Sequence, residues 1–107
     1  MKKLKGTVSH RERVIEDLRA DPKLARAYLL VAMEDDDPRV FLTALRTVAE
    51  ARGMARIAQA AGVRRESLYR TLSSTGNPRL STLLVVLKAT GLRLSLQTQK
   101  SMRDRAA

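Results

Sequence analysis

Two very short helical segments that meet at Gly62 constrain the fold more than any other feature of the chain. Apolar residues recur at helical spacing over residues 54–61, for about two turns, and resume over residues 64–73 for roughly two to three more. Two short helices joined so tightly cross at a steep angle. Such a pair requires a small residue where the helices approach and a turn residue that accepts a positive φ.

Residues 54–73 meet these requirements. Ala58 is small enough for close helix approach, and Gly62 follows four residues later, in the turn. Val63 is expected to plug the corner, and Leu68 to lie on the apolar seam behind the pair. The spacing therefore predicts a helix-turn-helix over residues 54–73.

Further helices are predicted on both sides of this motif. An aspartate followed by proline precedes the second and third of them and supplies an N-cap with a favourable first helical residue. Asn77 and Pro78 are expected to cap the last helix in the same way. Helical periodicity covers residues 10–20, 22–33, 38–51 and 77–90. In the second of these helices, Leu24, Ala27, Tyr28 and Val31 share one apolar stripe.

Residues 92–97 alternate strictly between leucine and polar residues, which indicates a strand. This segment either pairs across a dimer axis or packs on its own domain, and the pattern does not decide between the two. The chain is long enough for one domain and too short for two. We therefore expect a single all-α domain over residues 1–107, with an N-terminal helical extension (1–37), a helix-turn-helix core (38–98) and a flexible tail (99–107).

The net charge of +10 is concentrated in the second half of the chain. Residues 51–107 hold eleven Lys and Arg against two acids, whereas residues 1–50 hold ten against nine. A basic half on a small domain is typical of a protein that binds a polyanion such as nucleic acid, although a general solubility charge would also produce a surplus. Binding to a membrane surface is less favoured, because the chain has one Phe, two Tyr and no Trp.

Several absences narrow the class of protein further. Without cysteine, the chain can form neither a disulfide nor a thiolate metal site. No apolar run approaches the roughly 18 residues that cross a bilayer, and the basic N-terminus lacks the apolar region of a signal peptide, so we expect a cytoplasmic protein. The single histidine, His10, lies on a polar segment, and the acidic residues 34–37 lack the ligand spacing of a calcium loop. We expect no enzyme activity, no metal and no cofactor.

The outward face of the second short helix carries the candidates for sequence recognition. In a helix-turn-helix, the second helix lies in the major groove of DNA with its N-terminal residues toward the bases. Arginine can donate two hydrogen bonds to guanine, and glutamate can accept one from cytosine. An ordinary charged and solvated helix surface is the alternative interpretation of this face. With Leu68 and Leu72 directed inward, the expected base-contacting residues are Arg64, Arg65, Glu66, Tyr69 and Arg70.

A second group of residues is expected to contact the DNA backbone. Helix N-termini carry unpaired amides and the positive end of the helix dipole, so they attract phosphate. Contacts of this kind position a protein on DNA without specifying sequence. The expected backbone contacts are Arg52, Met54, Arg56, Gln59, Ser74, Asn77 and Arg79.

From about residue 41 to residue 96, the chain resembles the phage-repressor (Xre/Cro-type) DNA-binding domains. The likeness is carried by Ala58, Gly62, Val63 and Leu68, the Asn77-Pro78 helix entry and the helix of residues 83–91. More narrowly, the chain resembles the HigA-like antitoxins, which are addiction-module antidote proteins often encoded in prophages. That resemblance is carried by Ala51-Arg52-Gly53-Met54, Arg65-Glu66-Ser67-Leu68-Tyr69 and Gly76-Asn77-Pro78-Arg79. The chain differs from common repressors at Arg64, where they carry Ser, and at Met54, where they carry Gln.

This resemblance implies both a fold and a function. The implied fold is a lambda-repressor-like helix-turn-helix bundle of about four short helices, preceded by two N-terminal helices and followed by one short C-terminal strand. The implied function is that of a homodimer that represses its own operon at a palindromic operator in double-stranded DNA and neutralises a small toxin, a ribonuclease or gyrase poison. A homodimer is also physically reasonable, because one short recognition helix contacts only a few base pairs.

Two alternatives for the function stay open at this point. One is a stand-alone prophage-type repressor with no toxin partner. The other is a protein-interaction module that has lost DNA binding, which the arginine-rich outward face argues against.

Overall fold

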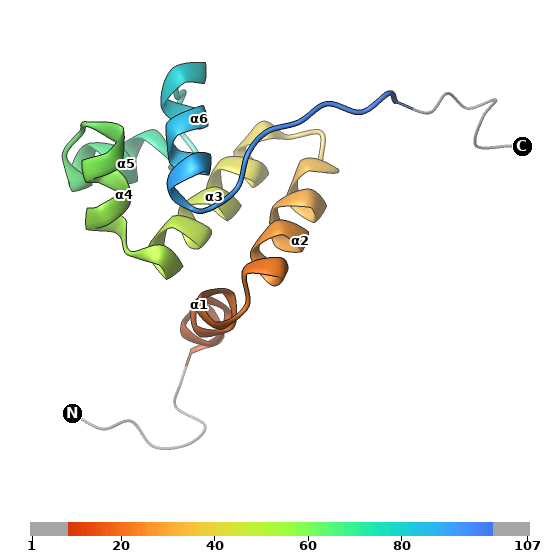
Figure 1. Cartoon of the computed structure of the whole chain (residues 1–107), viewed down its shortest axis with the longest axis horizontal. Coiled ribbons are helices and arrows are strands. Elements are labelled where there is room, and N and C mark those ends of the chain that lie inside the picture. Colours follow the sequence, from red (N-terminus) through yellow and green to blue (C-terminus); the bar gives the residue numbers. More distant parts are fainter. Residues whose placement is uncertain (1–8, 100–107) are drawn as a thin grey trace, which may run out of the picture.

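The structure, a computed structural model, describes residues 9–99, which form six α-helices and no strand. The helices are α1 (His10–Ala20), α2 (Pro22–Met33), α3 (Pro38–Arg52), α4 (Met54–Ala61), α5 (Arg65–Thr71) and α6 (Leu80–Ala89) (Figure 1). None of these helices is both long and apolar enough to span a membrane. Residues 1–8 of the expected N-terminal extension, and residues 100–107 of the expected flexible tail, lie outside the described residues.

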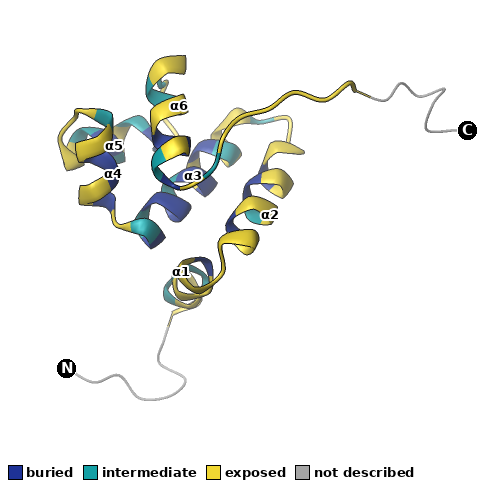
Figure 2. Cartoon of the chain, viewed as in Figure 1, coloured by how far each residue is buried: buried dark blue, intermediate teal, exposed yellow. Residues whose placement is uncertain are grey.

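Helix α3 is the centre of the fold (Figure 1). It contacts α1 and α2 on one side and α4 on the other, and α4 in turn contacts α5 and α6. Seven of the fifteen residues of α3 are buried. Figure 2 shows the buried residues concentrated on α3 and on the helix surfaces turned toward it. A helix with neighbours on both sides needs more than one apolar stripe, and α3 has them.

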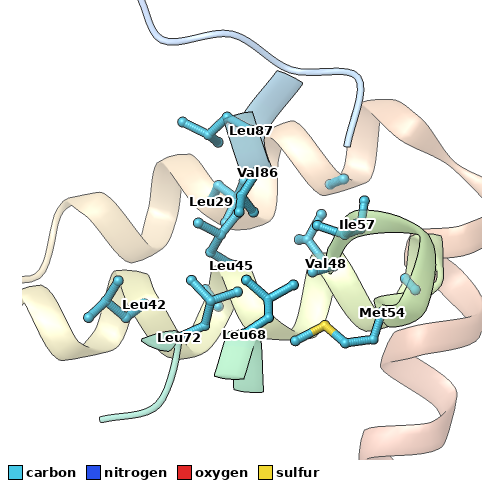
Figure 3. Close-up of a cluster of buried hydrophobic side chains, with 14 of the residues drawn as sticks. Leu29, Leu42, Leu45, Val48, Met54, Ile57, Leu68, Leu72, Val86 and Leu87 are labelled. Atoms are coloured by element: carbon cyan, nitrogen blue, oxygen red, sulfur yellow. The ribbon is translucent and has the colours of Figure 1, made fainter. Parts of the chain in front are cut away.

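One continuous core joins the N-terminal helices to α4, α5 and α6. Burying a leucine, isoleucine or valine side chain stabilises a fold by about 1.5–3 kcal/mol. Helices as short as α4 and α5 are not stable alone in water, so this burial is what keeps them helical. The core side chains in Figure 3 include Leu29 of α2, Leu45 and Val48 of α3, Ile57 of α4, Leu68 of α5, Leu72 directly after α5, and Val86 of α6.

Capping groups set the starts of the first three helices, and the sequence predicts the caps at Asp21 and Asp37. The side chains of Ser9, Asp21 and Asp37 each accept a hydrogen bond from a backbone amide in the first helical turn, at 2.9–3.0 Å. Pro22 and Pro38 occupy first-turn positions, where the missing amide proton leaves no hydrogen bond unmade.

The predicted C-terminal strand is wrong for the residues that the structure describes. Residues 92–97 follow α6 as an irregular extended segment, and the backbone groups of residues 93–97 form no hydrogen bond there (Figure 1). A strand exists only through its pairing with another strand. Alternation alone therefore could not produce one, because residues 9–99 contain no second strand.

The predicted start of the last helix is also wrong. Helix α6 begins at Leu80 rather than at Asn77, and Arg79 is its N-cap residue without a side-chain hydrogen bond. Arg79 keeps an extended backbone, with φ of −66° and ψ of 152°. The burial of Val86 and Leu87 fixes where α6 lies, and this tertiary requirement outweighs the local Asn-Pro capping signal.

The apolar stripe predicted on residues 22–33 is not the face that α2 buries. Ala25, Leu29 and Ala32 are the buried residues of this helix. On the predicted stripe, by contrast, Leu24 is exposed and Val31 is 68% exposed. Helix α2 therefore carries apolar residues on two faces, and only one of them is covered within residues 9–99.

We expect Asp37→Ala to lower the free energy of unfolding, because the Asp37 carboxylate caps α3 by accepting a hydrogen bond from the Arg39 amide. Hydrogen bonds from the Arg39 side chain also lower the pKa of Asp37. The stabilisation is therefore complete above the ordinary carboxyl pKa and is lost as the pH falls through the lowered value.

Urea denaturation at neutral and acid pH measures this effect. Asp36→Ala is the control, because this neighbouring exposed carboxylate lies outside the helix. Equal shifts of the unfolding midpoint in the two variants would show that the cap contributes nothing.

Candidate nucleic-acid interface

The turn between α4 and α5, residues 62–64, takes its geometry from Gly62. This glycine has a left-handed backbone, with φ of 70° and ψ of 28°. Its N–H donates to the carbonyl of Gln59 at 3.1 Å, and the N–H of Val63 donates to the carbonyl of Ala58 at 3.0 Å. The side chains of Ala58 and Leu68 are buried at the helix contact, as predicted.

Val63 does not plug the corner, contrary to the prediction. Its side chain is exposed and lies outside the core. Main-chain hydrogen bonds close the turn instead, so the Val63 backbone has a structural role that its side chain lacks.

The surface of α5 carries the predicted base-contacting residues. Arg64 precedes the helix, and Arg65, Glu66 and Arg70 have exposed side chains. Tyr69 is half-buried and packs against the core. The guanidinium carbon of Arg65 lies 5.4 Å from the centre of the Tyr69 ring, one helical turn away. This cation–π contact holds Arg65 against an anchored ring and so restricts its orientation at the surface.

These arginines have no acidic partner among residues 9–99. The ion pairs there join Arg11 and Arg46 to Glu50, and Arg39 to Asp37, all in the N-terminal half. A guanidinium without a carboxylate partner keeps its donors free for the oxygens of phosphate or of a guanine edge. We call the surface made by Arg64, Arg65, Glu66, Tyr69 and Arg70 the arginine face.

Four of the predicted backbone contacts are accessible. Arg56 and Gln59 are exposed on α4, and Ser74 and Arg79 are exposed between α5 and the start of α6. Helix α4 begins after Gly53, which offers no side-chain acceptor to the amides of the first turn. These amides, together with Arg56, form a positive end that suits an anionic oxygen.

The other three predicted backbone contacts are in surroundings less suited to phosphate. The Met54 side chain is buried in the core, so only its backbone amide is available. Arg52 is half-buried, and its Nε is enclosed without a hydrogen-bond partner. Asn77 lines a hollow together with Asp35 and Asp36, and these two carboxylates repel an anion.

Gly76 is a structural residue of the site that the spacing of the motif does not identify. A Cβ on Gly76 would lie 1.9 Å from the carbonyl oxygen of Thr71 and 2.8 Å from that of Arg70. The Gly76 N–H also donates to the carbonyl of Ser73 at 2.9 Å. The loop therefore closes against the last turn of α5, and only glycine permits that approach. A glycine soon after a short helix is the one sequence signal for such a contact.

Comparisons with known proteins give one family and one relative. A family model described as "Probable addiction module antidote protein" matches residues 11–98. A protein of Haemophilus influenzae, itself described only as uncharacterized, is 41% identical over 88 residues, which are 82% of this chain and 88% of the relative. No solved structure matches. The family match covers the six helices, except the first residue of α1, and most of the extended segment that follows α6.

We expect Gly76→Ala to destabilise the protein by about 1–3 kcal/mol, because the new Cβ displaces the loop from the end of α5. Gly62→Ala is the comparison, since nothing lies within 4 Å of a Cβ there and only the left-handed backbone is strained, at roughly 1–2 kcal/mol. Urea denaturation and the amide NMR spectrum of α5 measure both variants. Unchanged α5 resonances in Gly76→Ala would contradict the close-approach interpretation.

Proposed function

The chain belongs to the family of probable addiction module antidote proteins, and we propose that it neutralises a partner toxin and also binds DNA at its own operon. Its place in this family is the basis for the toxin partner. The DNA proposal rests on a different observation, the arginine face on a short helix that follows a tight turn. Neither role requires a catalytic step.

For DNA binding, α4 and α5 act as a helix-turn-helix of the phage-repressor type. Helix α5 lies in the major groove, with Arg64 and Arg65 near the base edges. Arg56, Gln59 and Arg79 contact phosphates on either side. Because the arginines lack acidic partners within residues 9–99, no internal ion pair is lost when they meet DNA.

Two other functions fit the molecule less well. A protein-interaction module that had lost DNA binding would have no need of an exposed, acid-poor set of arginines on α5. A stand-alone repressor would keep that set, but it leaves the membership in an antidote family without a role. A toxin-neutralising regulator uses both features.

A homodimer completes the proposal, because two α5 helices related by two-fold symmetry would contact two halves of a palindromic operator. The segment after α6 supplies apolar residues for the contact between the two subunits. Leu94 is exposed and Leu96 is 95% exposed, in an extended stretch, residues 93–97, that forms no backbone hydrogen bond within residues 9–99. Next to this segment lies a hollow of about 330 Å³ that Leu30, Met33 and Phe41 also line.

We expect a selection of bound duplexes from a random pool to yield a palindromic sequence. On that sequence Arg65→Ala should weaken binding by about 1–3 kcal/mol and relax preference at one base pair, because a bidentate contact to guanine is lost. Arg13→Ala, an exposed arginine of α1, should leave the affinity unchanged. Affinity should fall with salt, with a log–log slope of roughly −0.9 per phosphate contacted.

Two outcomes would contradict this prediction. An equal loss on all sequences would make Arg65 a phosphate contact, whereas no enrichment and a flat salt response would reject DNA binding itself.

We expect the double variant Leu94→Asp/Leu96→Asp to shift the protein from dimer to monomer, because two charges replace apolar contacts between subunits. The matched control is Ser95→Asp/Gln97→Asp, which adds the same charge at polar positions of the same segment. Sedimentation velocity reports the oligomeric state. A dimer that survives the leucine changes would place the subunit contact elsewhere.

A further inference from the structure

An open groove of about 730 Å³ lies between α2 and α3. From α2 it is lined by Leu24, Tyr28 and Val31, and from α3 by Val40, Thr43 and Ala44. Of these α2 residues, Leu24 and Val31 are exposed, and Tyr28 is half-buried against the core. The wall of the groove is therefore largely apolar, although it is open to solvent.

The spacing of these α2 residues is typical of a helix face that packs against a further helix. Leu24, Tyr28 and Val31 follow one another at four and three residues, the interval at which side chains share one helix face. An adjacent face of α2 already packs in the core through Ala25, Leu29 and Ala32, and Ala32 also borders the groove. A contiguous exposed apolar surface rimmed by polar residues is typical of a protein-contact site.

Acidic groups lie in the turn next to the groove, where Asp37 lines the groove itself and Asp35 and Asp36 line a neighbouring hollow. The turn between α2 and α3 contains Glu34, Asp35, Asp36 and Asp37, which we call the acidic turn. Asp37 lines the groove and pairs with Arg39, but Glu34, Asp35 and Asp36 have no basic partner among residues 9–99. Within residues 9–99, no group of acids could hold a metal ion. The acidic turn repels DNA and attracts a basic protein.

We propose that the groove between α2 and α3 holds the partner toxin, through an amphipathic helix of the toxin. That helix places an apolar ridge against Leu24, Tyr28 and Val31, and its Lys or Arg residues face the acidic turn. A helix laid in a groove is a common way for one protein to hold another, and it uses anchors at this same three-and-four spacing. The proposal rests on the antidote role and names the surface that performs it.

The groove and the arginine face are separate surfaces on one body. Ser74, just after α5, is the only groove residue that also belongs to the predicted DNA contacts. Substitutions at Val31 or Val40 therefore test toxin binding without touching the arginine face.

The experiment measures binding of the purified product of the reading frame that adjoins this gene, by calorimetry, to the full-length wild-type chain and to matched variants. Val40→Glu alters the groove, and Val85→Glu on α6 is its control, since these valines are 39% and 38% exposed and Val85 lines no hollow that the structure shows. We expect Val40→Glu to weaken binding by at least about tenfold, because it buries an unpaired charge, while Val85→Glu changes it by less than about twofold. Val31→Glu, at a more exposed position, should act like Val40→Glu.

A second pair of variants tests the acidic turn. Glu34→Lys should weaken toxin binding, most strongly at low salt, whereas Glu16→Lys on α1 makes the same charge change on a remote exposed surface and should not. All variants should keep the wild-type circular dichroism spectrum and the wild-type affinity for the selected operator.

Three results would overturn the proposal, and each points to a different cause. Wild-type affinity in both Val31→Glu and Val40→Glu would show that the toxin binds elsewhere, with the antidote role intact. Dissociation of the free protein into monomers by these variants would assign the groove to a second copy of the chain. Failure of the wild-type chain to bind the neighbouring product would reject the groove assignment together with the antidote function for that product.

Discussion

The burial of α3 between two groups of helices is the constraint on which the rest of the molecule depends. Leu45 and Val48 of this helix are fully covered, by α1 and α2 from one side and by the α4–α6 group from the other. Because the same helix serves both groups, the N-terminal pair is not an appendage to the α4–α6 group. A change that loosens α3 would loosen the groove and the arginine face together.

The arginine face depends on this core through very few residues. Helix α5 has seven residues, and its inward anchors are Leu68 within the helix and Leu72 at its C-cap, both without exposed surface. The loop through Gly76 then closes its last turn. Two leucines and one glycine thus hold the surface that we propose contacts DNA, while the side chains on that surface are free of internal ion pairs within residues 9–99.

The sequence predicts well those features that are decided locally. The caps at Asp21 and Asp37 and the left-handed turn at Gly62 are examples, because each depends on residues only a few positions apart. The exposed positions of the predicted arginines follow in the same way from the inward direction of Leu68 and Leu72.

Features decided by distant contacts are the ones that the sequence could not predict. Helix α2 has two apolar faces, and only its packing shows that Ala25, Leu29 and Ala32 are the buried set. Residues 92–97 have the alternation of a strand but no partner strand within residues 9–99. The start of α6 follows the burial of Val86 and Leu87 rather than the Asn-Pro signal. The close approach at Gly76 is likewise visible only once the loop is folded.

The position of α3 also separates charge along the molecule. The acidic turn precedes the first residue of this fifteen-residue helix, and Arg52 and Arg56 lie at its other end, about 22 Å away by helical rise. Such a separation gives the protein a permanent electric dipole, which exerts a torque on the molecule near any strongly charged surface. Near a polyanion, the dipole would rotate the protein before contact, so that Arg52 and Arg56 face the polyanion and the acidic turn faces away from it. The protein would then reach the surface already oriented for contact through these arginines.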